Sequence, residues 1–308
     1  MPFRRRLLAA LACTGVGAAC SSGGGDSATA GPTDATTTTP GLPAGETVPG
    51  PGEPVPAPGA PVPAPVPPAS PVPAAPVWVV GAELLPLRPD GLGEILPTPA
   101  VLVDRRLPTA DLLPPPASGA FESTIGPVDN AVRARMGGTL ADGCPVGPDD
   151  LRYLTMSFRG FDGRAHTGEM VVHAEEAEDV VSVFRRLFEA DFPLEEMRLI
   201  TDADVAAPPT GDGNNSGAFI CRAVRGGTRF SAHASGLAID VNPFHNPYQR
   251  DDIVLPERAS AYLDRGNVRP GMILRGDVVT EAFADIGWTW GGDFGSVIDT
   301  MHFSATGG

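Results

Sequence analysis

Hydrophobic and polar residues alternate regularly only in the second half of the chain. Residues 174–193, AEEAEDVVSVFRRLFEADFP, predict an amphipathic helix, because apolar residues recur every three or four positions before a proline. Its apolar face would consist of Val180, Val183, Phe184, Leu187 and Phe188. A second helix is predicted in TEAFADIGW, residues 280–288.

Short strands are predicted around these helices. They fall in the alternating stretches 149–163, 166–174, 195–200, 236–242 and 300–305. In GLAIDVN, residues 236–242, alternation places Ile239 and Val241 on one face and Asp240 on the other. Helices beside short, antiparallel strands predict an α+β fold, with a small antiparallel sheet and flanking helices.

The region before this domain has no such regularity. Residues 77–143 contain apolar runs, VWVV and AVLVD, that are broken by proline and glycine. This pattern predicts a strand or two with long irregular connections, in an N-terminal extension that wraps the domain formed by residues 144–308.

Residues 21–76 are of low complexity, rich first in Gly, Ser and Thr and then in Pro, Ala and Val. Such a composition buries too little apolar surface to offset the entropy of ordering, which predicts a disordered tether. In a polyproline conformation of about 3.1 Å per residue, its proline-rich half would span roughly 90 Å.

Residues 1–20 have the features of a secretory signal: three arginines at positions 4–6, an apolar stretch, and small residues before Cys20. Cys20 after Gly-Ala-Ala resembles the lipobox of bacterial lipoproteins, so we expect its lipidation and an anchor on the outer face of the cell membrane. Plain cleavage nearby and twin-arginine export stay open as alternatives.

Export changes how the cysteines are interpreted. With Cys13 in the signal and Cys20 at the anchor, Cys144 and Cys221 remain, and an oxidising compartment favours a disulfide between them. Two buried free thiols are the alternative. The formal net charge of -15 argues against a nucleic-acid partner, because phosphate binding needs clustered positive charge.

Four residues carry candidate chemistry. His233 and Asp240 lie seven residues apart, and His302 follows Asp299 by three. Two histidines and a carboxylate leave the fourth position of a tetrahedral zinc open to water, as in catalytic sites, and Asp299 could take the proton of that water. From spacing alone, His233 as a capped loop residue and Asp240 as a hydrogen-bond acceptor at a strand end remain an alternative.

The motif S-x-H-x-x-G-x-A-x-D, residues 231–240, together with D-x-x-H-F, residues 299–303, resembles the VanY-like zinc D-alanyl-D-alanine carboxypeptidases and their D-Ala-D-Ala dipeptidase and L-alanyl-D-glutamate endopeptidase relatives. GFDGRAHTGEMVV, NNSGAFICR and GWTWGGDF resemble a subgroup of that family. The resemblance implies a zinc site in a cleft over the sheet, with one Zn²⁺ held by His233, Asp240 and His302.

The same resemblance implies further roles. Asp299 would be the general base, Arg222 would hold a substrate carboxylate or stabilise the oxyanion, and Ser231 would help to bind substrate. Ser216 and Gly217 depart from the subgroup pattern before the arginine, and Ser304 departs from the pattern after His302. Neither departure removes a ligand.

The implied activity is removal of the terminal D-alanine from peptidoglycan stem peptides in the cell wall. An L-alanyl-D-glutamate endopeptidase with the same site is one alternative, and a non-catalytic wall-binding lipoprotein is another. Loops that close the cleft would decide between exo- and endopeptidase, and residues 251–277 are the expected loop. We interpret His166 as structural or substrate-lining, His245 as a loop residue, and the protein as a monomer.

Overall fold

The computed structural model describes residues 78–141, 143–224 and 227–307. Contacts divide the chain into two units, and all described residues belong to the second, residues 71–308. The expected signal peptide, Cys20 and the tether lie outside the described residues. Within the described part, no helix is long and apolar enough to cross a membrane.

The largest sheet is an antiparallel hairpin with one added strand. Its order is β1-β2-β3, with β1 (Ser123–Pro127), β2 (Leu151–Arg159) and β3 (Ala165–His173). The pairing of β2 with β3 runs without a break from Leu151↔His173 to Arg159↔Ala165. Alternation along both strands gives the sheet two apolar faces, so helices can cover both sides.

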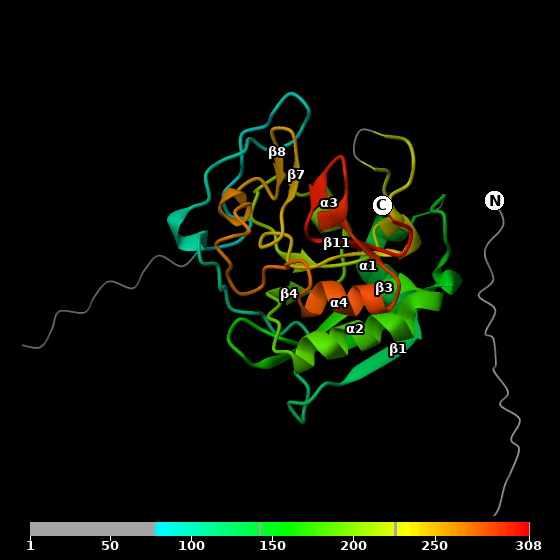
Figure 1. Cartoon of the computed structure of the whole chain (residues 1–308). Helices are drawn as coiled ribbons and strands as arrows, with labels where there is room; N and C mark the ends of the chain where they lie inside the picture. The colour runs from blue at the N-terminus through cyan, green and yellow to red at the C-terminus, as the bar shows by residue number, and fades with distance from the viewer. Residues whose placement is uncertain (1–77, 142, 225–226, 308) are drawn as a thin grey trace, which may run out of the picture. The chain divides into compact units, whose positions relative to one another are not determined.

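Helix α2 (Ala177–Glu189) covers one face of this sheet, and α4 (Val278–Asp285) lies beside α2 (Figure 1). Both helices confirm the predictions. Four residues of the predicted apolar face of α2 share one core cluster with Leu154, Met156, Met170 and Val172 of the sheet: Val180, Val183, Phe184 and Leu187. The fifth, Phe188, is buried against Phe121. On α4, Phe283 stacks on Phe303 with 4.0 Å between ring centroids, which joins this helical layer to the strand that carries His302.

Three smaller sheets complete the described part. The first has the order β6-β11-β9, with β6 (Ala238–Asp240), β11 (His302–Ser304) and β9 (Thr289–Trp290). The second has the order β10-β7-β8, with β10 (Ile298–Asp299), β7 (Tyr248–Arg250) and β8 (Ile253–Leu255). The third is the parallel pair β4 (Glu196–Met197) and β5 (Asn215–Ser216). The α+β class is confirmed, but the strands form four small sheets where one was expected.

Short helical pieces connect these elements. They are α1 (Asn130–Met136), α3 (Asp202–Ala206) and 3-10 turns at Ala100–Leu102, Gly137–Leu140, Pro148–Asp150, Ala174–Glu176, Ala232–Ser235, Ser260–Tyr262 and Gly291–Asp293. Helix α1 covers the other face of the large sheet, where Val132 and Met136 pack on Leu151 and Val171. This helix was not predicted, because it offers few apolar positions to a periodicity search.

The N-terminal segment differs in detail from the expectation. Of the two apolar runs, Ala100–Leu102 forms a 3-10 turn, and Val79 and Val80 are exposed. The strand falls instead at β1, which pairs with β2. In Figure 1 the cyan N-terminal segment runs beside the orange chain that follows β8, where Thr98 Oγ1 donates a hydrogen bond to the carbonyl oxygen of Arg258 at 2.5 Å.

A buried arginine fixes this segment to the rest of the unit. Arg105 is 1% exposed, and its guanidinium donates to both carboxylate oxygens of Glu195 at 2.7 and 2.6 Å. His245 Nε2 lies 3.0 Å from the carbonyl oxygen of Arg105. His245 lies in a turn but is fully buried, and burial lowers its pKa to about 3. It is therefore a neutral core residue of this junction.

His166 makes a second connection. Its Nδ1 lies 2.6 Å from Asp111 Oδ1, and its Nε2 lies 3.1 Å from Asp162 Oδ1 in the β2–β3 turn. The ring is 1% exposed. These contacts give His166 a structural role that links residue 111 to the hairpin.

Cys144 and Cys221 form a disulfide bond that closes a sequence separation of 77 residues. In the chain-entropy account, a loop of this length stabilises the fold by about 4 kcal/mol. We expect the double variant Cys144→Ser/Cys221→Ser to lose about that much free energy of unfolding, measured by urea denaturation against the oxidised wild type. Equal unfolding midpoints for the oxidised and reduced wild-type protein would contradict this prediction.

Candidate metal centre

The loop before β6 builds the first ligand position. Ser231 Oγ accepts a hydrogen bond from His233 N at 3.3 Å and caps the 3-10 turn Ala232–Ser235. Gly236 ends the turn with a φ of +66°, and a Cβ there would lie 2.5 Å from His173 N. The spacing between His233 and Asp240 therefore has a local cause: a capped turn is followed by a glycine in the left-handed conformation and then by a strand.

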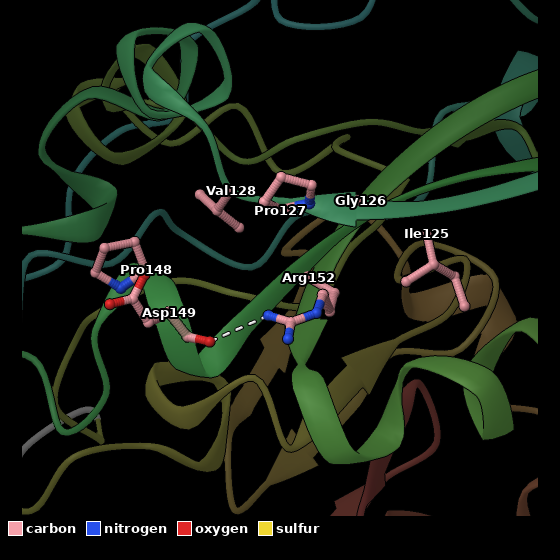
Figure 2. Close-up of a pocket in the computed structure, with 7 residues that line it drawn as sticks. All are labelled: Ile125, Gly126, Pro127, Val128, Pro148, Asp149 and Arg152. Carbon is pink, nitrogen blue, oxygen red and sulfur yellow. Dashed lines mark hydrogen bonds between the residues drawn. The ribbon is translucent and has the colours of Figure 1, made fainter.

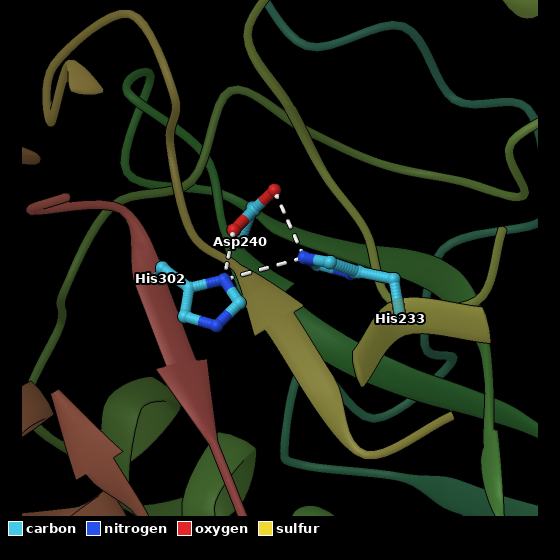
Figure 3. A group of neighbouring side chains, drawn as sticks. All are labelled: His233, Asp240 and His302. Atoms are coloured by element: carbon cyan, nitrogen blue, oxygen red, sulfur yellow. Dashed lines mark hydrogen bonds and ion pairs between the residues drawn. The ribbon is translucent and has the colours of Figure 1, made fainter. Parts of the chain in front are cut away.

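The pairing of β6 with β11 brings the other two residues together. Asp240 is the direct cross-strand partner of His302 in this antiparallel pair. Directly opposed residues project from the same face of a sheet. The two side chains, some sixty residues apart in sequence, therefore meet in front of the turn that carries His233 (Figure 3).

The three side chains converge on one point. His302 Nδ1 lies 3.1 Å from Asp240 Oδ1 and 3.3 Å from His233 Nε2, and His233 Nε2 lies 3.4 Å from Asp240 Oδ2. Ligand atoms around a tetrahedral zinc, with bonds of about 2.0–2.1 Å, are separated by about 3.3 Å. The arrangement fits a small metal ion, and the three residues together can hold one.

Hydrogen bonding sets the orientation of His233. Its Nδ1 donates to the carbonyl oxygen of Ala218 at 2.6 Å, so Nε2 is the ring nitrogen that faces the group and would bind a metal once it is deprotonated. His233 and His302 are 4% and 9% exposed, and the Asp240 side chain is 26% exposed. The group is thus open to solvent on the side of Asp240. The role of Ala218 could not be found from the sequence, because its backbone oxygen makes the contact.

Mutual electrostatics prepares these residues to bind a cation. Burial alone would raise the pKa of Asp240, but the charges and hydrogen bonds of His233 and His302 hold it below the usual range. Burial alone would lower the pKa of His233, but the charge of Asp240 and the hydrogen bonds with Asp240 and Ala218 raise it. Asp240 is therefore an anion, and its charge favours a second proton on His233, with which a metal would compete.

This competition predicts a proton release. Binding of zinc to the metal-free protein at pH 6.5 should release about one proton, because a histidine ligand must be neutral. Calorimetric titrations in two buffers of different ionisation enthalpy measure that number. Binding without proton release would mean that His233 is already neutral, contrary to the direction of its pKa.

Asp299 lies in β10, three residues before His302, and its charge interacts with those of Asp240 and His302. In the sheet, Asp299 pairs with Tyr248 of β7. Its Oδ1 is buried and has no hydrogen-bond partner among the described residues, although the residue as a whole keeps intermediate exposure. Burial raises the pKa of Asp299 to about 7, the charge of Asp240 adds to the rise, and His302 and Arg222 oppose it. Such a carboxylate can exchange a proton near neutral pH.

The comparison with known families bears directly on this group. Residues 225–305 match the family model described as D-alanyl-D-alanine carboxypeptidase. This segment is a D-alanyl-D-alanine carboxypeptidase family domain. No curated protein and no solved structure matches the chain. The matched range includes His233, Asp240, Asp299 and His302, and the family implies metallopeptidase activity.

The remaining expected site residues lie at the start of this carboxypeptidase domain or just before it. Arg222 precedes the matched range by three residues, and its side chain is exposed. Its charge opposes the rise in the pKa of both His233 and Asp299, so it acts on the metal group. Cys221 joins it to Cys144 through the disulfide. Ser231 contacts His233 through the cap.

A hollow elsewhere in the chain contains none of these residues. It measures about 430 Å³, and Figure 2 shows it where β1 ends and β2 begins. Arg152 donates there to the carbonyl oxygen of Asp149 at 3.1 Å. Its lining residues are Ile125, Gly126, Pro127, Val128, Pro148, Asp149 and Arg152. The chemistry of the carboxypeptidase domain therefore lies outside this hollow.

Gly291, in the GWTWGGDF segment of the carboxypeptidase domain, packs directly against Asp299. A Cβ at Gly291 would lie 2.5 Å from the Asp299 carbonyl oxygen and 2.9 Å from its Cβ. We expect Gly291→Ala to shift Asp299 and to lower kcat for peptide hydrolysis by about a hundredfold, because a displacement of about 1 Å can have that effect.

Gly295→Ala is the matched control, because a Cβ at Gly295 meets nothing within 4 Å. Steady-state kinetics and metal analysis of both variants test the prediction. A Gly291→Ala protein with wild-type kcat would show that Asp299 tolerates the displacement.

Proposed function

We propose that the protein is an exported zinc carboxypeptidase that removes the terminal D-alanine from peptidoglycan stem peptides. One observation carries the proposal: three ligand atoms lie at tetrahedral spacing, and Asp299, three residues before the ligand His302, has a buried Oδ1 without a partner among the described residues and a charge that interacts with those of Asp240 and His302. The family match supports a peptidase, and the donor set of two histidines and one carboxylate supports zinc.

The roles of the residues follow from their positions. Zinc, when bound by His233, Asp240 and His302, supplies a Lewis acid that acidifies water and polarises a carbonyl group. Asp299 accepts the proton of the attacking water at Oδ1 and returns it to the leaving amine. The pKa of Asp299, about 7 in the protein without a bound ion, suits both transfers.

Arg222 and Ser231 are proposed to bind the substrate. The exposed guanidinium of Arg222 can hold the terminal carboxylate or stabilise the negative charge on the carbonyl oxygen. Ser231 Oγ accepts a hydrogen bond from His233 N, which leaves its own proton free to donate to a peptide oxygen.

The position of the cleaved bond distinguishes the proposal from its alternatives. The zinc-loaded protein is incubated with a stem pentapeptide, and the products are identified by mass spectrometry. Loss of a single terminal alanine supports the carboxypeptidase, and internal cleavage supports an L-alanyl-D-glutamate endopeptidase. An intact peptide would support the non-catalytic wall-binding lipoprotein.

Residues 251–277 remain the proposed determinant of exo- or endopeptidase specificity. This segment contains β8, and Tyr262 and Ile273 within it are fully buried. Met272 packs with Phe244, four residues after the ligand Asp240. The segment is therefore a packed part of the unit whose outer turns could limit the cleft.

The proposed location is the outer face of the cell membrane. The disulfide and the cell-wall peptidase family indicate an environment outside the cytoplasm. Lipidation of Cys20 would anchor the protein, as a monomer, within reach of the wall. Mass spectrometry of the N-terminal peptide of the mature protein tests for the lipid.

A further inference from the structure

A short antiparallel pair of segments beside His233 carries two arginines among its described residues, Arg222 and Arg229. Ala223 and Phe230 form an antiparallel bridge, flanked by hydrogen bonds from Ser231 N to Arg222 O at 3.1 Å and from Val224 N to Arg229 O at 2.9 Å. This pattern makes Arg222 the partner of Ser231 and Val224 the partner of Arg229. Residues 225–226 lie outside the described residues.

The pairing places both arginines on the same face. Cross-strand partners project to the same side, and residues two positions apart along a strand also share a side. Arg222, Val224, Arg229 and Ser231 therefore form one face, and Ala223 and Phe230 form the other. Arg229 is the diagonal neighbour of Arg222, at a Cβ separation of about 7–8 Å for such pairs.

This face adjoins the candidate metal centre. Ser231 caps the turn that holds His233, and Ile220 N donates to the His233 carbonyl oxygen at 3.3 Å. The charge of Arg222 acts on Asp299. The face that carries Arg229 therefore continues from Ser231, which contacts the turn of the ligand His233.

Charge distribution along the chain sets this face apart. The protein has 37 acidic residues and a formal net charge of -15, yet no Asp or Glu occurs in residues 213–239. Within the described ranges, neither Arg222 nor Arg229 forms an ion pair with a carboxylate. Both cations are exposed and available to an anionic ligand.

We infer that Arg229 is a specificity-determining residue that binds a second, non-terminal carboxylate of the substrate peptide, beside the group held by Arg222. The inference rests on the proposed function and specifies its substrates further. They would be peptides that carry free carboxylates on the N-terminal side of the cleaved bond. A guanidinium suits this role, because its planar donors match the two oxygens of a carboxylate.

The test compares two stem pentapeptides, one with all non-terminal carboxylates free and one with all of them amidated. The wild type should show a KM about tenfold lower for the free-carboxylate peptide, as expected for one charge-assisted contact at a partly solvated site. Arg229→Gln should remove this preference, with the effect in KM, and Arg229→Lys should keep part of it. Higher salt should weaken the preference only where the arginine is present.

Arg106→Gln is the matched control, because Arg106 is an exposed arginine paired with Asp104 in the N-terminal segment. This variant should keep the wild-type preference. The inference would be overturned if the wild type had the same KM for both peptides, or if Arg229→Gln kept the wild-type difference in KM. In either case, cleavage of the peptides would still support the proposed function.

A binding measurement separates this inference from the proposed function. The Kd of each peptide for Asp299→Ala protein is measured by calorimetry, in which turnover is not needed. A preference in Kd that disappears in Asp299→Ala/Arg229→Gln supports the role of Arg229 even if the wild type cleaves neither peptide. Equal Kd values for both peptides in the Asp299→Ala protein would refute it.

Discussion

Replacing Asp299 with alanine is expected to lower kcat for stem-peptide hydrolysis by about 10²- to 10⁴-fold, the usual contribution of a positioned acid–base group. The reason is the buried Oδ1, which has no hydrogen-bond partner within the described part of the chain. Burial and the charge of Asp240 raise the pKa of this carboxylate to about 7, which suits a group that exchanges a proton near neutral pH. The variant should still bind metal, because the three ligand residues are unchanged.

The pH profile gives a second measure of the same role. Asp299 acts as a base only when ionised, so kcat/KM of the wild type should fall as the pH drops through its pKa. A bound cation lowers that pKa, which places the acid limb at or below pH 7. Asp285→Ala is a suitable control, because Asp285 is exposed and pairs with Arg186 at the end of α4. Wild-type kcat in the Asp299→Ala protein would remove the general base from the mechanism.

The second large effect concerns the anchor of the N-terminal segment. Arg105→Met should lower the free energy of unfolding by about 3–5 kcal/mol, because it leaves the charge of Glu195 buried without a partner. Both side chains are nearly inaccessible, at 0% and 8% exposure. The variant also loses the hydrogen bond from the guanidinium to the carbonyl oxygen of Asp212 at 2.7 Å.

Urea denaturation of the Arg105→Met protein measures this loss of free energy of unfolding, with the Arg106→Gln protein as the control. Arg106 is adjacent in sequence but exposed, so its replacement should change stability by less than about 0.5 kcal/mol. The double variant Arg105→Met/Glu195→Gln should recover part of the loss, because no unpaired charge remains. Equal unfolding midpoints for Arg105→Met and the wild type would show that the segment is not anchored there.

The sequence predicted best those features that depend on neighbouring residues. Helix α2 follows from the spacing of Val180, Phe184 and Leu187, and β6 follows from alternation around Asp240. The order of the motif around His233 also has a local cause, because Ser231 caps the turn and Gly236 ends it. The helix at 280–288 was displaced by about two residues, because Asp277 caps it earlier than the apolar pattern indicates.

Long-range contacts account for most of what was not predicted. Arg105 meets Glu195 across 90 residues, and His245 meets the Arg105 backbone across 140. Neither contact leaves a periodic pattern in the sequence. The convergence of Asp240 and His302 depends on strand register. The residue types suggested a shared metal and the resemblance to a family supported it, but no local pattern in the sequence gives the register. The sequence offered only a weak indication that Gly291 matters: Gly291 and Gly292 lie in GWTWGGDF, one of the segments that resembles the family.

The central claim is that His233, Asp240 and His302 hold one zinc ion on which hydrolysis depends. Metal analysis of the purified full chain, with and without His302→Ala, tests it together with a peptide assay. We expect about one equivalent of zinc in the wild type, loss of zinc and activity in His302→Ala, and recovery of the chelator-treated wild type on adding zinc. Peptide hydrolysis that persists in metal-free protein, or in His302→Ala without zinc, would contradict the claim.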